Sequence, residues 1–220
     1  MRVVVFDLDG TLVDTAADLV AAANACFRAL GHGDLLDPVR DADTALKGGR
    51  PMLRLGFARL GTGDEAAVEA EYPRLLEHYE AHIDTHSRLY PGVEDAVSRL
   101  RAAGMATAIC TNKPERLAAI LMRSLKADGW FDALVGADTL PVRKPDPAPL
   151  HEAVRRAGGP DARAILVGDT LTDHETARRA GVPSVLVAFG PEGPGLGRLG
   201  PDAMLETYAD LPALAERLLR

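Results

Sequence analysis

The chain has 220 residues, 47% apolar and 26% charged, a composition typical of a globular protein rather than a disordered chain. Its 32 acidic and 25 basic residues give a net charge of −7, which argues against a broad nucleic-acid surface, so we expect no nucleic-acid partner. No stretch approaches the roughly 18 apolar residues of a membrane span, and the apolar run at the N-terminus is too short for a signal peptide, so we expect a cytoplasmic protein with no membrane contact.

The first predicted element is a buried strand over residues 3–6, which ends on two carboxylates, Asp7 and Asp9. Gly10 and Thr11 follow, and by themselves such residues more often form a polar turn. Open α/β sheets, however, bind ligands at the carboxyl ends of their strands. The two acids are therefore also placed to meet a substrate or a metal.

The next part of the chain shows only helical patterns. We expect helices over residues 15–30, 38–46, 51–60 and 64–83, with Thr15 and Asp18 as a capping box for the first and Pro73 kinking or splitting the last. Roughly 70 helical residues are far more than a strand crossover needs. We therefore expect a core domain of residues 1–14 and 88–220, with a helical cap domain of residues 15–87 inserted into it.

From residue 93 onward, apolar strand patterns alternate with amphipathic helices. We expect helices over residues 93–103, 114–125, 147–156 and 173–180, and strands over residues 105–110, 133–135, 164–167 and 184–187. This alternation indicates a parallel sheet covered on both faces. The predicted fold class is α/β, a Rossmann-like parallel sheet with helices on both faces plus an inserted all-helical cap.

Polar residues follow three further strands. Thr111 and Asn112 offer a hydroxyl and backbone N–H groups to an anion, although such a pair is usually helix-capping chemistry. Lys144 lies in a stiff proline-flanked loop, although a lone loop lysine is usually a solvated charge. Asp169 and Asp173 are four residues apart and can share one side of a helix, and either can serve as an N-cap. Acids for Mg²⁺, a fixed cation and a hydroxyl together are what phosphoryl transfer requires.

In this order, these segments resemble the four motifs of the haloacid dehalogenase-like phosphohydrolases. The matching segments are Asp7-Leu8-Asp9-Gly10-Thr11-Leu12-Val13-Asp14, Thr111-Asn112, Lys144-Pro145-Asp146-Pro147, and Gly168-Asp169-Thr170 with Asp173. The resemblance spans essentially the whole chain, and the helical insertion looks like the C1 cap of that family. Within the family the chain looks most like the phosphoglycolate phosphatases, which implies hydrolysis of 2-phosphoglycolate to glycolate and phosphate.

The resemblance also implies a role for each acid. Asp7 would be the nucleophile that forms an aspartyl-phosphate, and it would bind Mg²⁺ as well. Asp9 would protonate the leaving alkoxide and later deprotonate the attacking water, and its backbone carbonyl would bind the metal. Asp169 would complete the protein ligands, and Asp173 would bind the metal directly or orient a water on it.

The remaining candidates concern phosphate and leaving-group binding. The resemblance implies that Thr111, the backbone of Asn112 and Lys144 hold the phosphoryl oxygens. In the cap, the turn Lys47-Gly48-Gly49-Arg50 carries two cations and unhindered N–H groups, and we expect Lys47 or Arg50 to meet the carboxylate of the substrate. A solvated basic turn is an equally open interpretation.

Several alternatives remain at this point. A phosphatase for a sugar phosphate, a nucleotide or pyrophosphate fits the same motifs, as does a phosphomutase, which differs only in its cap. A non-catalytic phospho-ligand module is least favoured, because it would not need all of these acids. We expect a small phosphomonoester as the partner, and a monomer or homodimer. His78, His82 and His86, spaced by four, are interpreted as surface residues rather than a zinc site, and the glycine-rich residues 195–200 as a loop rather than a dinucleotide site.

Overall fold

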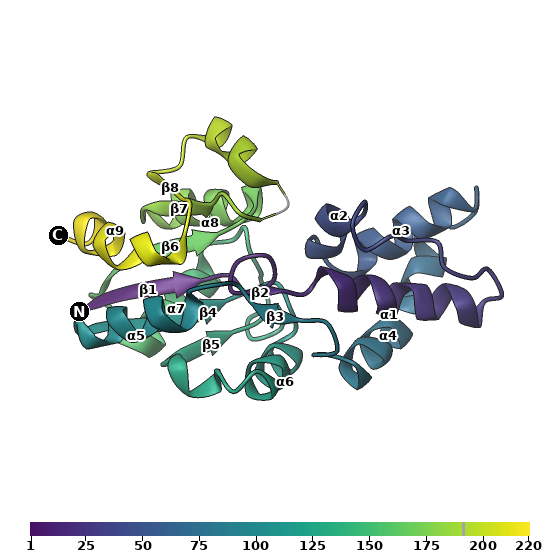
Figure 1. Ribbon diagram of the computed structural model, residues 1–220, viewed down its shortest axis with the longest axis horizontal. Helices are drawn as coiled ribbons and strands as arrows, with labels where there is room; N and C mark the ends of the chain where they lie inside the picture. Colours follow the sequence, from purple (N-terminus) through teal and green to yellow (C-terminus); the bar gives the residue numbers. More distant parts are fainter. Residues whose placement is uncertain (191) are drawn as a thin grey trace. The chain divides into compact units, whose positions relative to one another are not determined.

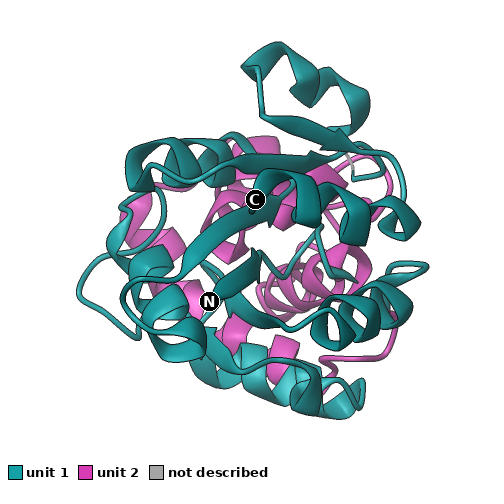
Figure 2. Cartoon of the chain, turned by 90° about the vertical axis from the view of Figure 1, so that its left-hand side faces the viewer, with its two compact units in different colours: residues 1–13, 89–220 teal, residues 14–88 magenta. Residues whose placement is uncertain are grey.

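The computed structural model describes residues 1–190 and 192–220. The chain divides into two compact units, one of Met1–Val13 with Leu89–Arg220 and one of Asp14–Arg88 (Figure 2). Strands β2 (Val13–Asp14) and β3 (Arg88–Leu89) pair as a small sheet at the two points where the chain passes between the units. Among the described residues, every helix is too short or too polar to cross a membrane.

The first unit is built on a six-stranded parallel sheet (Figure 1). In spatial order, its strands are β5 (Ala133–Val135), β4 (Met105–Cys110), β1 (Arg2–Phe6), β6 (Arg163–Gly168), β7 (Ser184–Val187) and β8 (Ala203–Leu205). The apolar run of β1 is fully buried on both faces, which suits a strand at the centre of the sheet. Phe6 pairs with Ile109 of β4 and with Val167 of β6. The residues that follow these three strands therefore meet at one edge.

Helices flank this sheet and confirm the predicted α/β class. They are α5 (Val93–Ala102), α6 (Glu115–Ser124), α7 (Ala148–Gly158), α8 (Leu171–Ala180) and α9 (Leu211–Leu218), with short 3-10 helices η1 (Asp128–Trp130), η2 (Gly193–Leu199) and η3 (Tyr208–Asp210). Val3 and Val5 of β1 share one buried cluster with Leu150 and Ala153 of α7. Helix α5 packs on β4 and against α9.

The second unit consists of four helices and their connections. These are α1 (Ala16–Ala29), α2 (Ala42–Leu46), α3 (Gly49–Arg59) and α4 (Glu65–Ala81). Helix α4 packs against both α1 and α3. It continues through Pro73 as one helix, so of the two predicted effects of Pro73 the split is wrong, and the kink stays a prediction. Buried Val68 and Leu75 lie on either side of Pro73, and their packing outweighs the loss of one backbone hydrogen bond.

Two further local predictions are wrong. The hydroxyl of Thr15 makes no capping bond, and Asp18 instead accepts hydrogen bonds from the N–H groups of His86 and Ser87 and from the Ser87 hydroxyl, at 2.7 to 3.0 Å. These donors are 68 and 69 residues later in the chain, and they take the place of the backbone N–H group at the start of α1 that a capping box would use. The glycine-rich residues 195–200 belong largely to the short helix η2 rather than to an open loop.

Candidate active site

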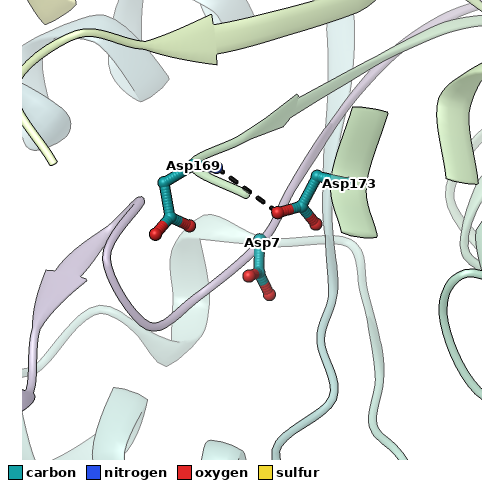
Figure 3. A group of neighbouring side chains, drawn as sticks. All are labelled: Asp7, Asp169 and Asp173. Carbon is teal, nitrogen blue, oxygen red and sulfur yellow. Dashed lines mark hydrogen bonds between the residues drawn. The ribbon is translucent and has the colours of Figure 1, made fainter. Parts of the chain in front are cut away.

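Three buried carboxylates meet at the carboxyl edge of the sheet (Figure 3). Asp7 follows β1, Asp169 follows β6, and Asp173 lies in the first turn of α8. Each offers one carboxylate oxygen, and these oxygens lie within 4.8 Å of one another. In the parts of the chain that the structure describes, this is the one group of three or more acidic, histidine or cysteine side chains with such spacing.

Lys144 lies against two of these acids. Its Nζ is 2.9 Å from Asp7 Oδ1 and 2.6 Å from Asp173 Oδ1, and the side chain is 2% exposed. Burial acts to lower the pKa of Lys144, but Asp173 and Asp7 more than offset this and raise the pKa above its usual range. Lys144 is therefore a buried ammonium within the acidic cluster, not a solvated loop charge.

The pKa values of the acids show that one ammonium does not balance three carboxylates. Burial raises the pKa of Asp7 to about 6, with Lys144 limiting the rise and Asp173 adding to it. Burial, together with Asp173 and Asp7, also raises the pKa of Asp169 well above its usual range. Asp7 Oδ1 accepts no hydrogen bond from the described residues, although it is in ion-pair contact with Lys144. Buried carboxylate oxygens whose negative charge is not fully balanced by Lys144 fit a divalent cation such as Mg²⁺.

The carboxylate of Asp173 is occupied on both oxygens. Oδ1 contacts Lys144, and Oδ2 accepts hydrogen bonds from the Thr170 hydroxyl at 2.6 Å, the Thr170 N–H at 3.1 Å and the Asp169 N–H at 3.3 Å. The bond from the Thr170 N–H, together with a bond from the Asp173 N–H to the Thr170 hydroxyl oxygen at 3.4 Å, forms the capping box of α8. A Cβ at Gly168 would lie 2.3 Å from that of Asp173, so only glycine lets the strand end approach the helix this closely. Asp173 thereby fixes both Lys144 and the loop that carries Asp169.

A second set of contacts holds Asp169 from the β1 side. The hydroxyl of Thr11 donates to Asp169 Oδ1 at 2.8 Å, and the carbonyl of Thr11 accepts a hydrogen bond from the Tyr208 hydroxyl at 2.7 Å. Burial raises the pKa of Tyr208, so this phenol stays protonated and able to donate. Tyr208 is not among the residues predicted from the sequence, because no motif marks it and it is remote in sequence from Thr11.

Asp9 is paired with Lys113, which is also not among the residues predicted from the sequence. Lys113 Nζ lies 2.8 Å from Asp9 Oδ1 and 3.0 Å from Oδ2, and Lys113 is 6% exposed. The available signal was its position, since Lys113 directly follows the Thr111-Asn112 pair and precedes Pro114 at the end of β4. Among the described residues, the site in this unit therefore contains two buried lysines: Lys144 contacts Asp7 and Asp173, and Lys113 contacts Asp9.

The two predicted phosphate-binding residues after β4 have distinct environments. Thr111 is buried, its N–H donates to the Val135 carbonyl at 2.9 Å, and its hydroxyl accepts from the Lys113 N–H at 3.2 Å. Asn112 is exposed, and its side-chain amide donates to the Lys144 carbonyl at 3.0 Å. Asn112 therefore connects the loop after β4 to the loop that carries Lys144.

The predicted substrate-binding turn lies in the second unit. Lys47 is exposed at the end of α2, and α3 begins at Gly49, two residues before the predicted start at residue 51. The Arg50 guanidinium forms two hydrogen bonds to the Glu69 carboxylate, at 2.5 and 2.8 Å, and its carbon lies 3.6 Å from the centre of the Tyr72 ring. Arg50 thus already has partners on α4.

Comparisons with known proteins agree on one family. A family model for haloacid dehalogenase-like hydrolases matches residues 1–181. A phosphoglycolate phosphatase from Agrobacterium fabrum is 41% identical and one from Caulobacter vibrioides 38% identical, over 98% of this chain and 93% and 91% of those proteins. The crystal structure of a predicted phosphoglycolate phosphatase from Haemophilus somnus superposes with a TM-score of 0.82 at 22% identity, covering 97% of both chains, and shows the shared fold.

Proposed function

The chain belongs to the haloacid dehalogenase-like hydrolases, and we propose that it is a Mg²⁺-dependent phosphatase that hydrolyses 2-phosphoglycolate to glycolate and phosphate. The observation that carries the reaction type is the contact of buried Lys144 with Asp7 and Asp173, beside Asp169, at the carboxyl edge of the sheet. The curated relatives named phosphoglycolate phosphatase, at about 40% identity over nearly the whole chain, support the substrate.

In the first step we assign Asp7 as the nucleophile. One of its carboxylate oxygens forms a bond to phosphorus in line with the ester oxygen, whose bond to phosphorus breaks. Lys144, the Thr111 hydroxyl and the backbone of Asn112 would stabilise the charge on the phosphoryl oxygens. Asp9 gives its proton to the departing alkoxide, which leaves as the alcohol group of glycolate.

In the second step water attacks the phosphorus of the aspartyl-phosphate. Asp9, now a carboxylate, takes a proton from that water, and the bond between phosphorus and Asp7 breaks to release phosphate. Mg²⁺, held by Asp7, Asp169 and the backbone carbonyl of Asp9, would supply positive charge for the phosphoryl oxygens. Because both Asp173 oxygens have protein partners, we assign Asp173 to positioning Lys144 and the β6 loop rather than to direct metal binding.

The second unit would act as the cap inserted into the core, closing over the site and excluding water. Lys47, Gly48, Gly49 and Arg50 remain the predicted contacts of the substrate carboxylate, and Arg50 would have to exchange Glu69 for that group. A monomer or homodimer in the cytoplasm remains the prediction for the assembly and the compartment.

A substrate panel tests the proposal. With Mg²⁺ present, we expect kcat/KM for 2-phosphoglycolate to exceed that for sugar phosphates, nucleoside monophosphates and pyrophosphate by about 100-fold or more, since a charged group on the leaving side is recognised directly. Asp7→Asn should abolish turnover and the acid-stable ³²P label that the wild-type protein retains after quenching. A higher kcat/KM for another phosphomonoester would replace 2-phosphoglycolate in the proposal, and a wild-type protein inert toward the whole panel would overturn the phosphatase itself.

A further inference from the structure

We propose that Lys113 is a positioning residue that fixes the carboxylate of Asp9 for proton transfer to the leaving group. The proposal rests on the function above, in which Asp9 is the acid, and extends the machinery to a side chain outside the four motifs. Lys113 Nζ contacts both carboxylate oxygens of Asp9, at 2.8 and 3.0 Å. Two charge-assisted bonds from one buried ammonium restrict the rotation of that carboxylate.

The backbone of Lys113 is itself held on both sides. Its N–H donates to the Thr111 hydroxyl at 3.2 Å, and its carbonyl accepts from the Ala137 N–H at 3.0 Å. A Cβ at Gly136 would lie 2.4 Å from the Glu115 backbone, so the loops after β4 and β5 are in direct contact. The ammonium of Lys113 is therefore presented to Asp9 from a firmly anchored segment.

The two buried lysines divide the acids between them. Lys144 contacts Asp7 and Asp173, on the side of the nucleophile and of the predicted metal. Lys113 contacts Asp9, which acts on the leaving group. Because proton transfer requires a donor within hydrogen-bond reach of the ester oxygen, the orientation of Asp9 limits the first step only when the leaving group needs a proton. The value of kcat/KM reports that first step, whereas the later attack of water on the aspartyl-phosphate is common to all substrates.

Leaving-group dependence supplies a readout that a purely structural role would not change. An alkoxide leaving from an alkyl phosphate needs protonation, whereas acetate leaving from acetyl phosphate does not. The experiment compares kcat/KM of wild type and Lys113→Met for 2-phosphoglycolate, 2-hydroxyethyl phosphate and acetyl phosphate. We expect about a 100-fold loss on both alkyl esters, the size of a general-acid contribution, and less than about 3-fold on acetyl phosphate.

Matched variants isolate the pair. Lys126→Met removes the same charge from an exposed lysine of this unit and should leave all three values unchanged. Lys113→Arg keeps a cation and should recover much of the alkyl-ester activity. Asp9→Asn should show the same selective loss, and the double variant Asp9→Asn with Lys113→Met should be no worse than Asp9→Asn by more than about 3-fold, because the two residues act as a unit. If thermal melts show that Lys113→Met is unfolded, Lys113→Gln, which is uncharged but keeps a polar end, takes its place.

The outcomes separate the two proposals. Equal losses on all three substrates, or no loss, would overturn the role of Lys113. A loss confined to 2-phosphoglycolate would also overturn it, because Lys113 would then bind the substrate carboxylate instead of orienting Asp9. If Asp9→Asn itself affects acetyl phosphate and the alkyl esters alike, the acid role of Asp9 fails. If Asp9→Asn is selective and Lys113→Met is not, only the inference about Lys113 fails.

Discussion

Among the single residues of the site, Asp7 is one whose ionised form is destabilised by burial. Burial raises the pKa of Asp7 from 3.8 to about 6. Between these two values the native state keeps a proton that the unfolded chain has lost, so this group makes the free energy of unfolding fall as the pH rises through that window. Above it, the cost of the ionised carboxylate is constant. Below it, both states are protonated and the cost disappears.

Asp7→Asn should therefore stabilise the protein in EDTA in a pH-dependent way. Asparagine keeps the size of the side chain without the charge, and Lys144 keeps its contact with Asp173. We expect the variant to exceed wild type in free energy of unfolding by about 2 to 3 kcal/mol at pH 7, with the difference vanishing near pH 4. Urea unfolding at several pH values measures it. Asp128→Asn, at an exposed acid, is the control, and a difference that does not change with pH would contradict the prediction.

Among the helices and strands, those that the sequence predicts correctly are those marked by a pattern within their own residues. The strands β4, β5 and β7 begin and end at the predicted residues, because continuous apolar runs mark buried strands. The sequence pattern predicts no helix or strand after residue 187, where β8 has only three residues and α9 is short. Local capping rules gave the wrong role to Asp18, because donors remote in sequence bind it instead.

In the candidate site too, the residues that follow predicted strands are found from the sequence, and residues without a local pattern are not. The structure brings Asp7, Lys144, Asp169 and Asp173 together as the strand ends indicate, since residues that follow adjacent parallel strands share one edge. Lys113 and Tyr208 were missed. Their contacts with Asp9 and Thr11 exist only once the β4 loop and the C-terminal segment have packed, and a lone lysine or tyrosine carries no such signal in the sequence.

Asp18 provides a prediction for the second unit. This 3% exposed carboxylate accepts four hydrogen-bond contacts, which fasten the start of α1 to the segment after α4. Asp18→Ala leaves the N–H groups of His86 and Ser87 without that acceptor and should cost about 3 kcal/mol. Urea unfolding measures the loss, and faster amide exchange at Ser87 would locate it. Asp84→Ala, at a nearby exposed acid, should change stability by less than about 0.5 kcal/mol. Equal effects of the two variants would contradict this role.

In the core unit as a whole, the order of the strands explains how two buried lysines come to lie among four acids. Strand β1 lies between β4 and β6. The acids that follow β1 therefore lie between Lys113, which follows β4, and the acids that follow β6. Lys144 reaches the same place from the loop after β5. The chain as a whole carries a net charge of −7. Both facts favour binding of a divalent cation, but only the buried cluster predicts a specific site.

Mg²⁺ should therefore stabilise the folded protein through that cluster. A ligand that binds only the native state adds about 2.7 kcal/mol to the free energy of unfolding at 100 times its dissociation constant. The melting temperature should therefore rise with the logarithm of the Mg²⁺ concentration once that concentration exceeds the dissociation constant. Asp169→Asn should remove most of this rise, because it takes one buried oxygen donor from the cluster. Asp128→Asn removes the same charge from the surface and should keep the rise. Matched NaCl concentrations separate general screening of the acidic surface from site binding. Equal responses of the two variants would show that Mg²⁺ acts through the net charge instead of through Asp7 and Asp169.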